Sequence, residues 1–158
     1  VPPIIKEKNI FEVNINRNND LLVEGERMDI KDLREAAISF IDNGGGDGKI
    51  DEGVPTGPCN YCKGEKSISS SDHPNKAIIS VQSDRGTEYG TYLKVQNELI
   101  RAYSVLRNRL SKERYGIAFP ELEESYKEDR SNVSLKEKVE DIKRCYPEII
   151  SDAEPTSN

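Results

Sequence analysis

The sequence predicts an α/β (α+β) fold, a small mixed sheet with two main helices packed on one of its faces. Two observations lead to this fold class. Short segments with apolar residues at every second position, typical of strands, alternate with longer segments whose apolar residues recur every three or four positions, typical of helices. Because the longer segments are amphipathic, we expect them to cover one face of the sheet and to leave the other open to solvent or a partner.

Four segments are predicted to form strands, at residues 10–15, 21–23, 76–84 and 148–151. The first has Phe11, Val13 and Ile15 at alternate positions, and turn-forming residues then join it to the second segment. We therefore expect these two strands to pair antiparallel, with another turn following at 24–27. The third segment has apolar residues on both faces, which is typical of a central strand.

Helical spacing predicts the two main helices at about 30–41 and 88–113. Asp29 stands where the first helix needs a cap, and Thr87 stands in the same position before the second. Gly44 follows the first helix, as glycine commonly does at helix C-termini. The long second helix keeps its apolar stripe for several turns and is the clearest element of the sequence.

An extra helix is predicted near the C-terminus, with Ser134 and Glu137 as its capping box and Pro147 as its end. Ahead of it, residues 121–130 are heavily charged. We expect this segment to form either a solvated helix or a mobile linker. The elements then follow the order β-β-α, insertion, β-α, an extra α and a last β.

Residues 9–153 are predicted to form a single domain, followed by a polar tail at 154–158. The domain is interrupted at 42–72, where seven of the chain's 11 glycines lie. Loops of about thirty residues are uncommon in compact domains and tend to be functional, disordered or inserted. We interpret this Gly-rich segment as an insertion.

Composition excludes several classes of function. The chain has 158 residues, 34% of them hydrophobic, and a formal net charge of -6. An acidic chain without a basic run is poorly suited to binding nucleic acid through its phosphates or an anionic membrane surface. The sequence also has no run of about 18 apolar residues, so no segment of it is predicted to span a membrane.

The three cysteines, Cys59, Cys62 and Cys145, leave several chemistries open. A local structural disulfide or free thiols are favoured for the C-x-x-C pair, because this spacing alone is ambiguous. A zinc site would need four ligands, for which His73 and Cys145 are the candidates, but the long spacing to Cys145 is unlike a compact zinc module. A redox pair would need a helix directly after a strand, and no helix is signalled there.

No catalytic set can be assembled from the remaining residues, so we predict no enzyme, no cofactor and no metal. The glycine-rich stretch 43–54 is similar to a calcium loop but lacks the bidentate glutamate and a ligand at its third position. His73 lies in a polar turn and is expected to be solvated. Asp84 follows a strand, where sites often form, but is expected to close the turn before the long helix.

The run from His73 to Gln82, with the turn and helix that follow it, resembles the ExbD/TolR biopolymer transport family, in the long ExbD form found in Bacteroidota. The residues of the turn and helix that carry the likeness, here called the signature residues, are Asp84, Arg85, Gly86, Tyr92, Gln96, Asn97 and Glu98. The segments 59–64 and 9–41 fit the same family. The resemblance covers most of residues 9–153.

This resemblance implies a non-catalytic domain. ExbD-type proteins have a cytoplasmic tail, one transmembrane helix and a periplasmic domain of helices on one side of a sheet. The chain would then be the periplasmic domain of a single-pass inner-membrane protein, with residues 1–8 as a linker after the transmembrane helix. That helix, with the proton-responsive aspartate of the family, would precede Val1, so no acid in this sequence is expected to take its role.

The resemblance also implies partners. The family forms a homodimer within a pentameric channel, of which the ExbB-like channel subunit is the building block, and uses the proton motive force to drive a TonB-like protein, which energises outer-membrane receptors. The alternative is a TolR-like module of a Tol-Pal system that binds peptidoglycan. An oxidising periplasm would favour a disulfide between Cys59 and Cys62. The chain departs from shorter members of the family in the insertion and in the charged segment after the long helix.

Overall fold

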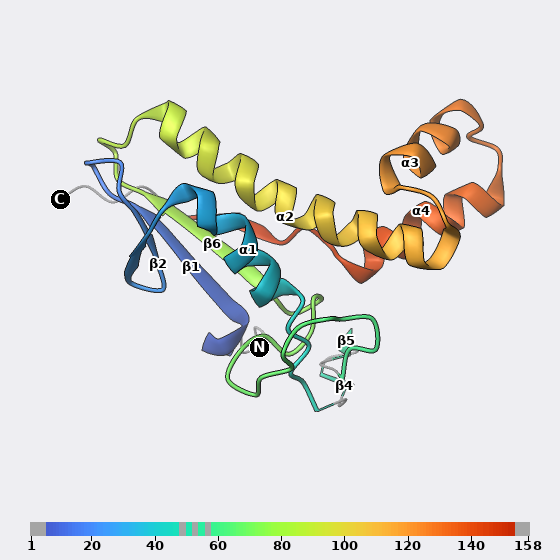
Figure 1. The fold of residues 1–158 in the computed structure, drawn as a ribbon, viewed down its shortest axis with the longest axis horizontal. Coiled ribbons are helices and arrows are strands. Elements are labelled where there is room, and N and C mark those ends of the chain that lie inside the picture. Colours follow the sequence, from blue (N-terminus) through green and yellow to red (C-terminus); the bar gives the residue numbers. More distant parts are fainter. Residues whose placement is uncertain (1–5, 48–49, 52–53, 56–57, 154–158) are drawn as a thin grey trace.

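The computed structural model describes residues 6–47, 50–51, 54–55 and 58–153, and it confirms the predicted mixed α/β fold. The main sheet has five strands in the order β3-β2-β1-β6-β7 (Figure 1). These strands are β1 (Ile10–Ile15), β2 (Leu21–Val23), β3 (Glu26–Met28), β6 (Ile78–Ser83) and β7 (Ile150–Asp152). The predicted tail and residues 1–5 of the predicted linker lie outside the described residues.

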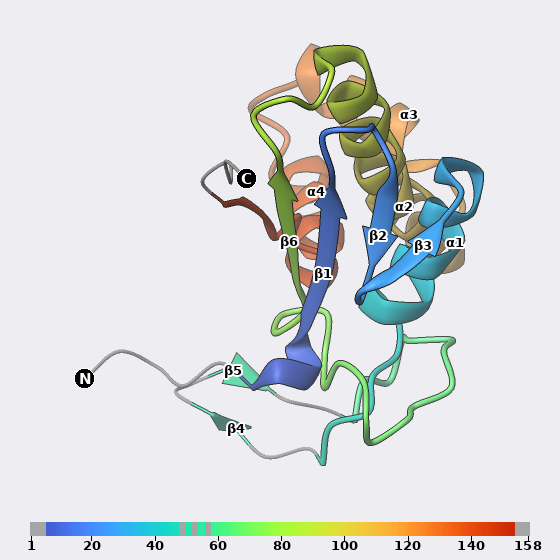
Figure 2. The ribbon, with the colours of Figure 1, turned by 90° about the vertical axis from the view of Figure 1, so that its left-hand side faces the viewer.

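Strand β1 is the centre of the sheet. It pairs antiparallel with β2, as predicted, and parallel with β6, so that Val13 lies between Val23 and Val81. Alternate residues of β1 are buried beneath the helices, whereas Glu12 is exposed on the opposite face. In Figure 2 the labelled α-helices lie behind the sheet, and the face toward the viewer carries none of them. The predicted open face is therefore present.

The described residues form four α-helices, which are α1 (Ile30–Ile41), α2 (Tyr89–Tyr115), α3 (Phe119–Glu128) and α4 (Val133–Cys145). Helix α1 and the first part of α2 pack against each other on the sheet. The core between these layers contains Val95 and Leu99 of α2, both fully buried, and Phe11 of β1 stacked on Phe40 of α1. This arrangement follows from the apolar stripe that each helix carries.

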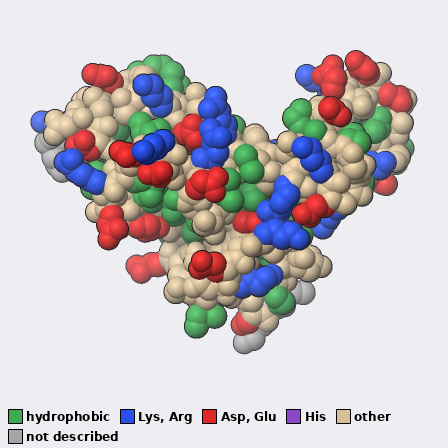
Figure 3. Space-filling view, in the orientation of Figure 1, with side chains coloured by type: hydrophobic (Ala, Val, Ile, Leu, Met, Phe, Trp, Pro, Cys, Tyr) green, Lys and Arg blue, Asp and Glu red, His purple; other side chains and the backbone are tan. Residues whose placement is uncertain are grey.

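Helix α2 continues beyond the sheet, because its 27 residues span about 40 Å. Helices α3 and α4 pack on this distal part, and residues 107–145 are here called the helical arm. The space-filling view shows the arm and the sheet layer as two lobes with a notch between them (Figure 3). Phe119 and Leu122 of α3 pack with Val139 and Ile142 of α4 in a common buried cluster.

One expectation for this region is confirmed and one is corrected. Of the two alternatives for segment 121–130, the structure shows the helix, because α3 extends to Glu128 and most side chains of the segment are exposed, although Leu122 is buried against its neighbours. Ser134 does not cap α4. The N-cap is Asn132, whose side chain accepts a hydrogen bond from the backbone N–H of Leu135 at 3.1 Å. Asparagine at this position satisfies one of the free N–H groups of the first turn.

The turns and caps before the main helices also differ from expectation. The predicted turn at 24–27 is shorter, with only Glu24 and Gly25 at positive φ, and the chain then forms β3. Asp29 is the N-cap of α1, but its side chain makes no capping bond. Helix α2 is capped at Glu88, and the Thr87 hydroxyl instead donates to backbone carbonyls at the end of β1.

The insertion is tied to the domain at both of its ends. It contains the short strands β4 (Ile50–Asp51) and β5 (Val54–Pro55). Within the calcium-like stretch 43–54, Gly48, Lys49, Glu52 and Gly53 lie outside the described residues. The amide of Asn43 donates to the carbonyl oxygens of Ser67 (2.9 Å) and Ser71 (2.7 Å), which closes the loop on itself. Asp72 then pairs with the 3-10 helix η1 (Glu7–Asn9) before β1.

Candidate functional site

The sheet ends in two edge strands of different character. Both edge strands are three residues long, but on one side β3 exposes two charged side chains, Glu26 and Arg27. Charged side chains on an edge strand discourage pairing with another chain. On the other side lies β7, which pairs in parallel with β6 and is flanked by apolar side chains. Strand β7 is therefore the edge better suited to receive a further strand.

Among the described residues, the backbone of β7 has one side bonded to β6 and one side without a neighbouring strand. The Ile79 N–H donates to the Ile149 carbonyl at 2.9 Å, and the Ala153 N–H donates to the Val81 carbonyl at 2.8 Å. Because successive residues of a strand point their backbone groups in opposite directions, the N–H and C=O groups of Ile150 and Asp152 face outward, away from β6. These groups form the free edge.

A shallow apolar pocket lies at the end of this edge. It has a volume of about 330 Å³ and is lined by Val81, Ser83, Tyr89, Tyr92, Asp152 and Ala153. The two tyrosine rings come from the first turn of α2 and stack with centroids 6.2 Å apart. Tyr89 is 72% exposed, which is unusual for a large aromatic side chain. The pocket can hold one apolar side chain of a strand added at β7.

Side chains of α2 fix β7 in place. Gln96 donates from its amide to the Asp152 carboxylate at 2.8 Å and to the Tyr92 hydroxyl at 3.1 Å. Burial and the neighbouring Asp152 raise the pKa of Tyr92 above its usual value, so its hydroxyl stays protonated at neutral pH. At the other end of the strand, the Ile149 N–H donates to the Tyr103 hydroxyl at 3.3 Å. The edge is therefore held rigidly on α2.

An apolar stripe on α2 continues the surface beside β7. Tyr89, Leu93 and Ile100 are 72%, 40% and 42% exposed. Their spacing of four and seven residues places them on one side of the helix, and Gln96, which contacts β7, lies on the same side. We call the free edge of β7, the tyrosine pocket and this stripe the β7 edge site.

The signature residues fall into two groups. Tyr92 and Gln96 belong to the β7 edge site, whereas Glu98 joins the two main helices through a two-pronged ion pair with Arg34, at 2.9 and 3.2 Å. Asn97 is exposed, and no hydrogen bond with another described residue assigns it a role. Glu98 is therefore a stabilising residue and does not belong to the candidate site.

Asp84, Arg85 and Gly86 lie in the turn between β6 and α2. The Asp84 carboxylate accepts a hydrogen bond from the Gly86 N–H at 2.8 Å and lies 3.7 Å from the Arg17 guanidinium. A side chain at Gly86 would press on Arg17, because an added Cβ would lie 3.1 Å from the Cβ of Arg17. Arg85 is exposed. Asp84 thus closes the turn, as the sequence predicted, and the turn does not reach the β7 edge.

The insertion carries a disulfide bond between Cys59 and Cys62. Both cysteines are buried and pack against Gly44, where an added Cβ would lie 2.9 Å from the Cβ of Cys59. Between them, Tyr61 reaches across to the end of α4, where its hydroxyl donates to the Cys145 carbonyl at 2.8 Å. Burial raises the pKa of this hydroxyl well above its usual value.

A buried charge pair completes this contact between the insertion and the helical arm. Arg109 donates to the Asp42 carboxylate at 2.8 Å, to the Tyr61 carbonyl at 3.1 Å and to the Tyr146 hydroxyl at 2.7 Å. The Tyr146 hydroxyl in turn donates to Asp42. We call Asp42, Tyr61, Arg109 and Tyr146 the insertion anchor. The two terminal nitrogens of Arg109 are hydrogen-bonded within the cluster, whereas its Nε makes no hydrogen bond in the described structure and lies 3.7 Å from the Glu113 carboxylate. Because these contacts join the insertion to α2 and to the end of α4, the cluster has the character of a structural contact.

The other cysteine and the histidine are buried. Cys145 is a free thiol, and burial raises the pKa of this thiol above its usual value. His73 is only 6% exposed, so the expectation of a solvated loop histidine was wrong. The Tyr61 ring contacts it edge-on, and burial lowers its pKa. Among the described residues, no group of three or more His, Cys, Asp or Glu side chains is arranged to hold a metal ion.

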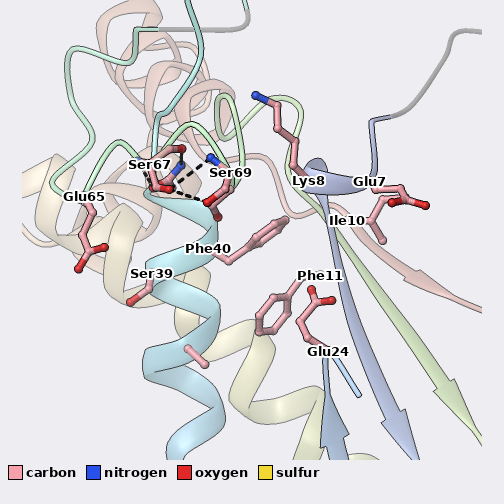
Figure 4. Close-up of a pocket in the computed structure, with 14 residues that line it drawn as sticks. Glu7, Lys8, Ile10, Phe11, Glu24, Ser39, Phe40, Glu65, Ser67 and Ser69 are labelled. Carbon is pink, nitrogen blue, oxygen red and sulfur yellow. Dashed lines mark hydrogen bonds between the residues drawn. The ribbon is translucent and has the colours of Figure 1, made fainter. Parts of the chain in front are cut away.

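A larger cavity of about 760 Å³, here called the α1–β1 groove, lies between α1, the start of β1 and residues 64–70 (Figure 4). Phe11 and Phe40 face each other on its floor, with ring centroids 5.0 Å apart. Its rim is polar and consists of Glu7, Lys8, Glu24, Ser39, Asn43, Glu65, Ser67, Ser69 and Ser70. No sequence motif predicts this groove, because its residues come from four separate segments.

Comparison with models of known protein families gives no match for this chain, and a search of curated proteins finds no relative. None of the described helices is both long enough and apolar enough to cross a membrane.

Proposed function

We propose that this chain is the non-catalytic periplasmic domain of an ExbD-type subunit of a TonB–ExbB–ExbD energy-transduction complex. In this function the domain dimerises and binds a TonB-like protein, and the complex uses the proton motive force to power outer-membrane import. The observation that carries the binding step is the free edge of β7 beside an exposed apolar surface of α2. The signature residues of the turn and of α2 support the family assignment.

An extended segment of the TonB-like protein would add to the sheet as a sixth strand. Main-chain hydrogen bonds to Ile150 and Asp152 would supply affinity, and alternate side chains of the segment would enter the tyrosine pocket and supply specificity. The helix stripe of Leu93 and Ile100 would cover the flank of the added segment. The disulfide between Cys59 and Cys62 supports an oxidising compartment such as the periplasm.

A proline substitution on the free edge tests this proposal. Asp152→Pro removes an outward N–H without removing a ladder bond to β6, whereas Asp152→Ala keeps that N–H and removes only the carboxylate bonded to Gln96. We expect Asp152→Pro to weaken binding of a TonB-like periplasmic fragment by about tenfold or more, and Asp152→Ala by about threefold at most. Isothermal titration calorimetry gives both affinities, and circular dichroism checks the fold of each variant.

Two outcomes test two different parts of the proposal, the binding surface and the identity of the partner. Equal binding by Asp152→Pro and the unchanged protein would contradict the edge as the binding surface. Absence of binding to any TonB-like fragment, with sedimentation of the protein on purified peptidoglycan, would contradict the TonB reading and support the TolR-like alternative.

A further inference from the structure

We propose that the α1–β1 groove is a second docking site, which accepts a short extended peptide segment carrying a lysine or arginine side chain. The groove lies on the β2 side of β1, away from the β7 edge site. It is therefore an independent surface, and it does not depend on the proposed function.

The groove begins where β1 loses its neighbouring strand. Strand β2 pairs only with Val13–Ile15, and the last backbone contact on this side joins the Glu24 N–H to the Glu12 carbonyl at 2.9 Å. Because alternate residues of β1 face β2, the Ile10 carbonyl points to this side, away from β6. Its N–H already closes the preceding 3-10 helix. The first residues of β1 therefore offer an acceptor to a peptide lying along the groove.

The charge of the rim decides the chemistry of the occupant. Glu7, Glu24 and Glu65 contribute three carboxylates to the lining. The cationic side chain in the same lining, Lys8, is already paired with Asp72 and also donates to the Ile68 carbonyl at 3.3 Å. Among the described lining residues, three carboxylates therefore stand against one ammonium group, so the rim is net acidic and a lysine or arginine of a partner has complementary charge.

The floor of the groove suits the rest of such a segment. The paired rings of Phe11 and Phe40 and the methyl group of Ala36 form an apolar base. The aliphatic stem of a lysine or arginine, or an apolar neighbour, can cover this base while the charged end stays at the rim. The volume of about 760 Å³ lies within the range of ligand pockets and admits a few residues. A phosphate-bearing ligand would meet the carboxylates and be repelled.

Two matched probes test the inference. We would titrate the ¹⁵N-labelled protein with the blocked pentapeptides Val-Lys-Val-Lys-Val and Val-Glu-Val-Glu-Val and follow backbone amide shifts. We expect the lysine peptide alone to move amides around Ile10, Glu24, Phe40 and Ser67, with saturation as for a single site. Equal responses to the two peptides, or shifts that do not gather around the groove, would overturn the proposal.

Substitutions at the rim distinguish the contribution of its charge to peptide binding from that of the shape of the groove. Glu65→Lys and Glu7→Lys change exposed side chains and are each expected to weaken binding of the lysine peptide by about two- to fivefold, as for partly exposed ion pairs. Ser39→Trp, also at an exposed position, would fill the groove and abolish saturation. The control Glu121→Lys makes the same charge change on the distant α3 and should leave the affinity unchanged. An equal loss in that control would contradict a local site.

Discussion

The Tyr61 hydroxyl donates a hydrogen bond to the Cys145 carbonyl at 2.8 Å, across 84 positions of sequence. The same ring lies edge-on to Tyr146, with centroids 5.3 Å apart, and the Arg114 guanidinium lies over it. Through Tyr61 the insertion is fastened to the end of α4, where the chain leaves the helical arm and returns to the sheet as β7. The insertion therefore braces the arm against the sheet layer.

The disulfide that flanks Tyr61 should contribute measurably to stability. Cys59→Ser with Cys62→Ser opens a very short loop, for which chain entropy predicts a loss of about 2 kcal/mol in the free energy of unfolding. Urea unfolding with and without a reductant measures this loss. The reductant should destabilise the unchanged protein and leave the double variant unaffected. Equal sensitivity of both proteins would show that the pair does not stabilise the fold.

The insertion anchor predicts a strong effect at Arg109. Arg109→Ala leaves the carboxylate of Asp42, which is 3% exposed, without its cationic partner. Breaking a buried pair in this way costs about 3–5 kcal/mol of unfolding free energy. Arg101→Ala removes an exposed arginine from the same helix and should cost less than about 1 kcal/mol. Similar unfolding midpoints for the two variants would contradict a structural role for the anchor.

Buried His73 predicts a decline of stability in mild acid. Burial lowers its pKa in the folded protein below the value of the unfolded chain, so the unfolded state binds more protons as the pH falls. The contribution of His73 is thus fully present above about pH 6.5 and is lost at lower pH, with a slope of at most about 1.4 kcal/mol per pH unit. Urea unfolding measured at about pH 6.5 and at lower pH should show this slope of the unfolding free energy, and the His73→Gln substitution should remove it.

The exposed stripe of α2 should matter for binding and not for folding. Leu93→Asp and Ile100→Asp change half-exposed side chains, so we expect unfolding free energies within about 0.5 kcal/mol of the unchanged protein. Under the proposed function, each should weaken binding of a TonB-like fragment by about tenfold, because it places a charge on an apolar contact. Unchanged affinity of both variants for the fragment would show that the stripe does not belong to the binding surface.

Local periodicity predicted most of the fold. The alternation of Phe11, Val13 and Ile15 located β1, and the repeat along α2 located the long helix within two residues of its ends. Strand β3 was missed because Glu26 and Arg27 are charged residues of an exposed edge, which carry no alternating pattern. Its pairing partner, and not its own composition, makes it a strand.

The surroundings of individual side chains were harder to predict, because they depend on contacts between distant segments. His73 lies in a polar stretch of sequence but is buried by Tyr61 and the neighbouring loop. The role of Asp152 follows from Gln96, 56 positions away. One signal could have been used at the sequence level. Tyr89 and Leu93 lie off the apolar stripe of α2, and such apolar residues on an exposed side mark an interaction surface.

The most direct test of the account is amide hydrogen exchange at Ile150 and Asp152, with and without a TonB-like periplasmic fragment. In the free protein these outward N–H groups should exchange quickly, whereas the Ala153 N–H, bonded to Val81 at 2.8 Å, should be protected. Strand addition at β7 predicts that the fragment slows exchange at Ile150 and Asp152 to the level of the ladder amides. Binding of the fragment with both amides still exchanging freely would contradict strand addition at β7.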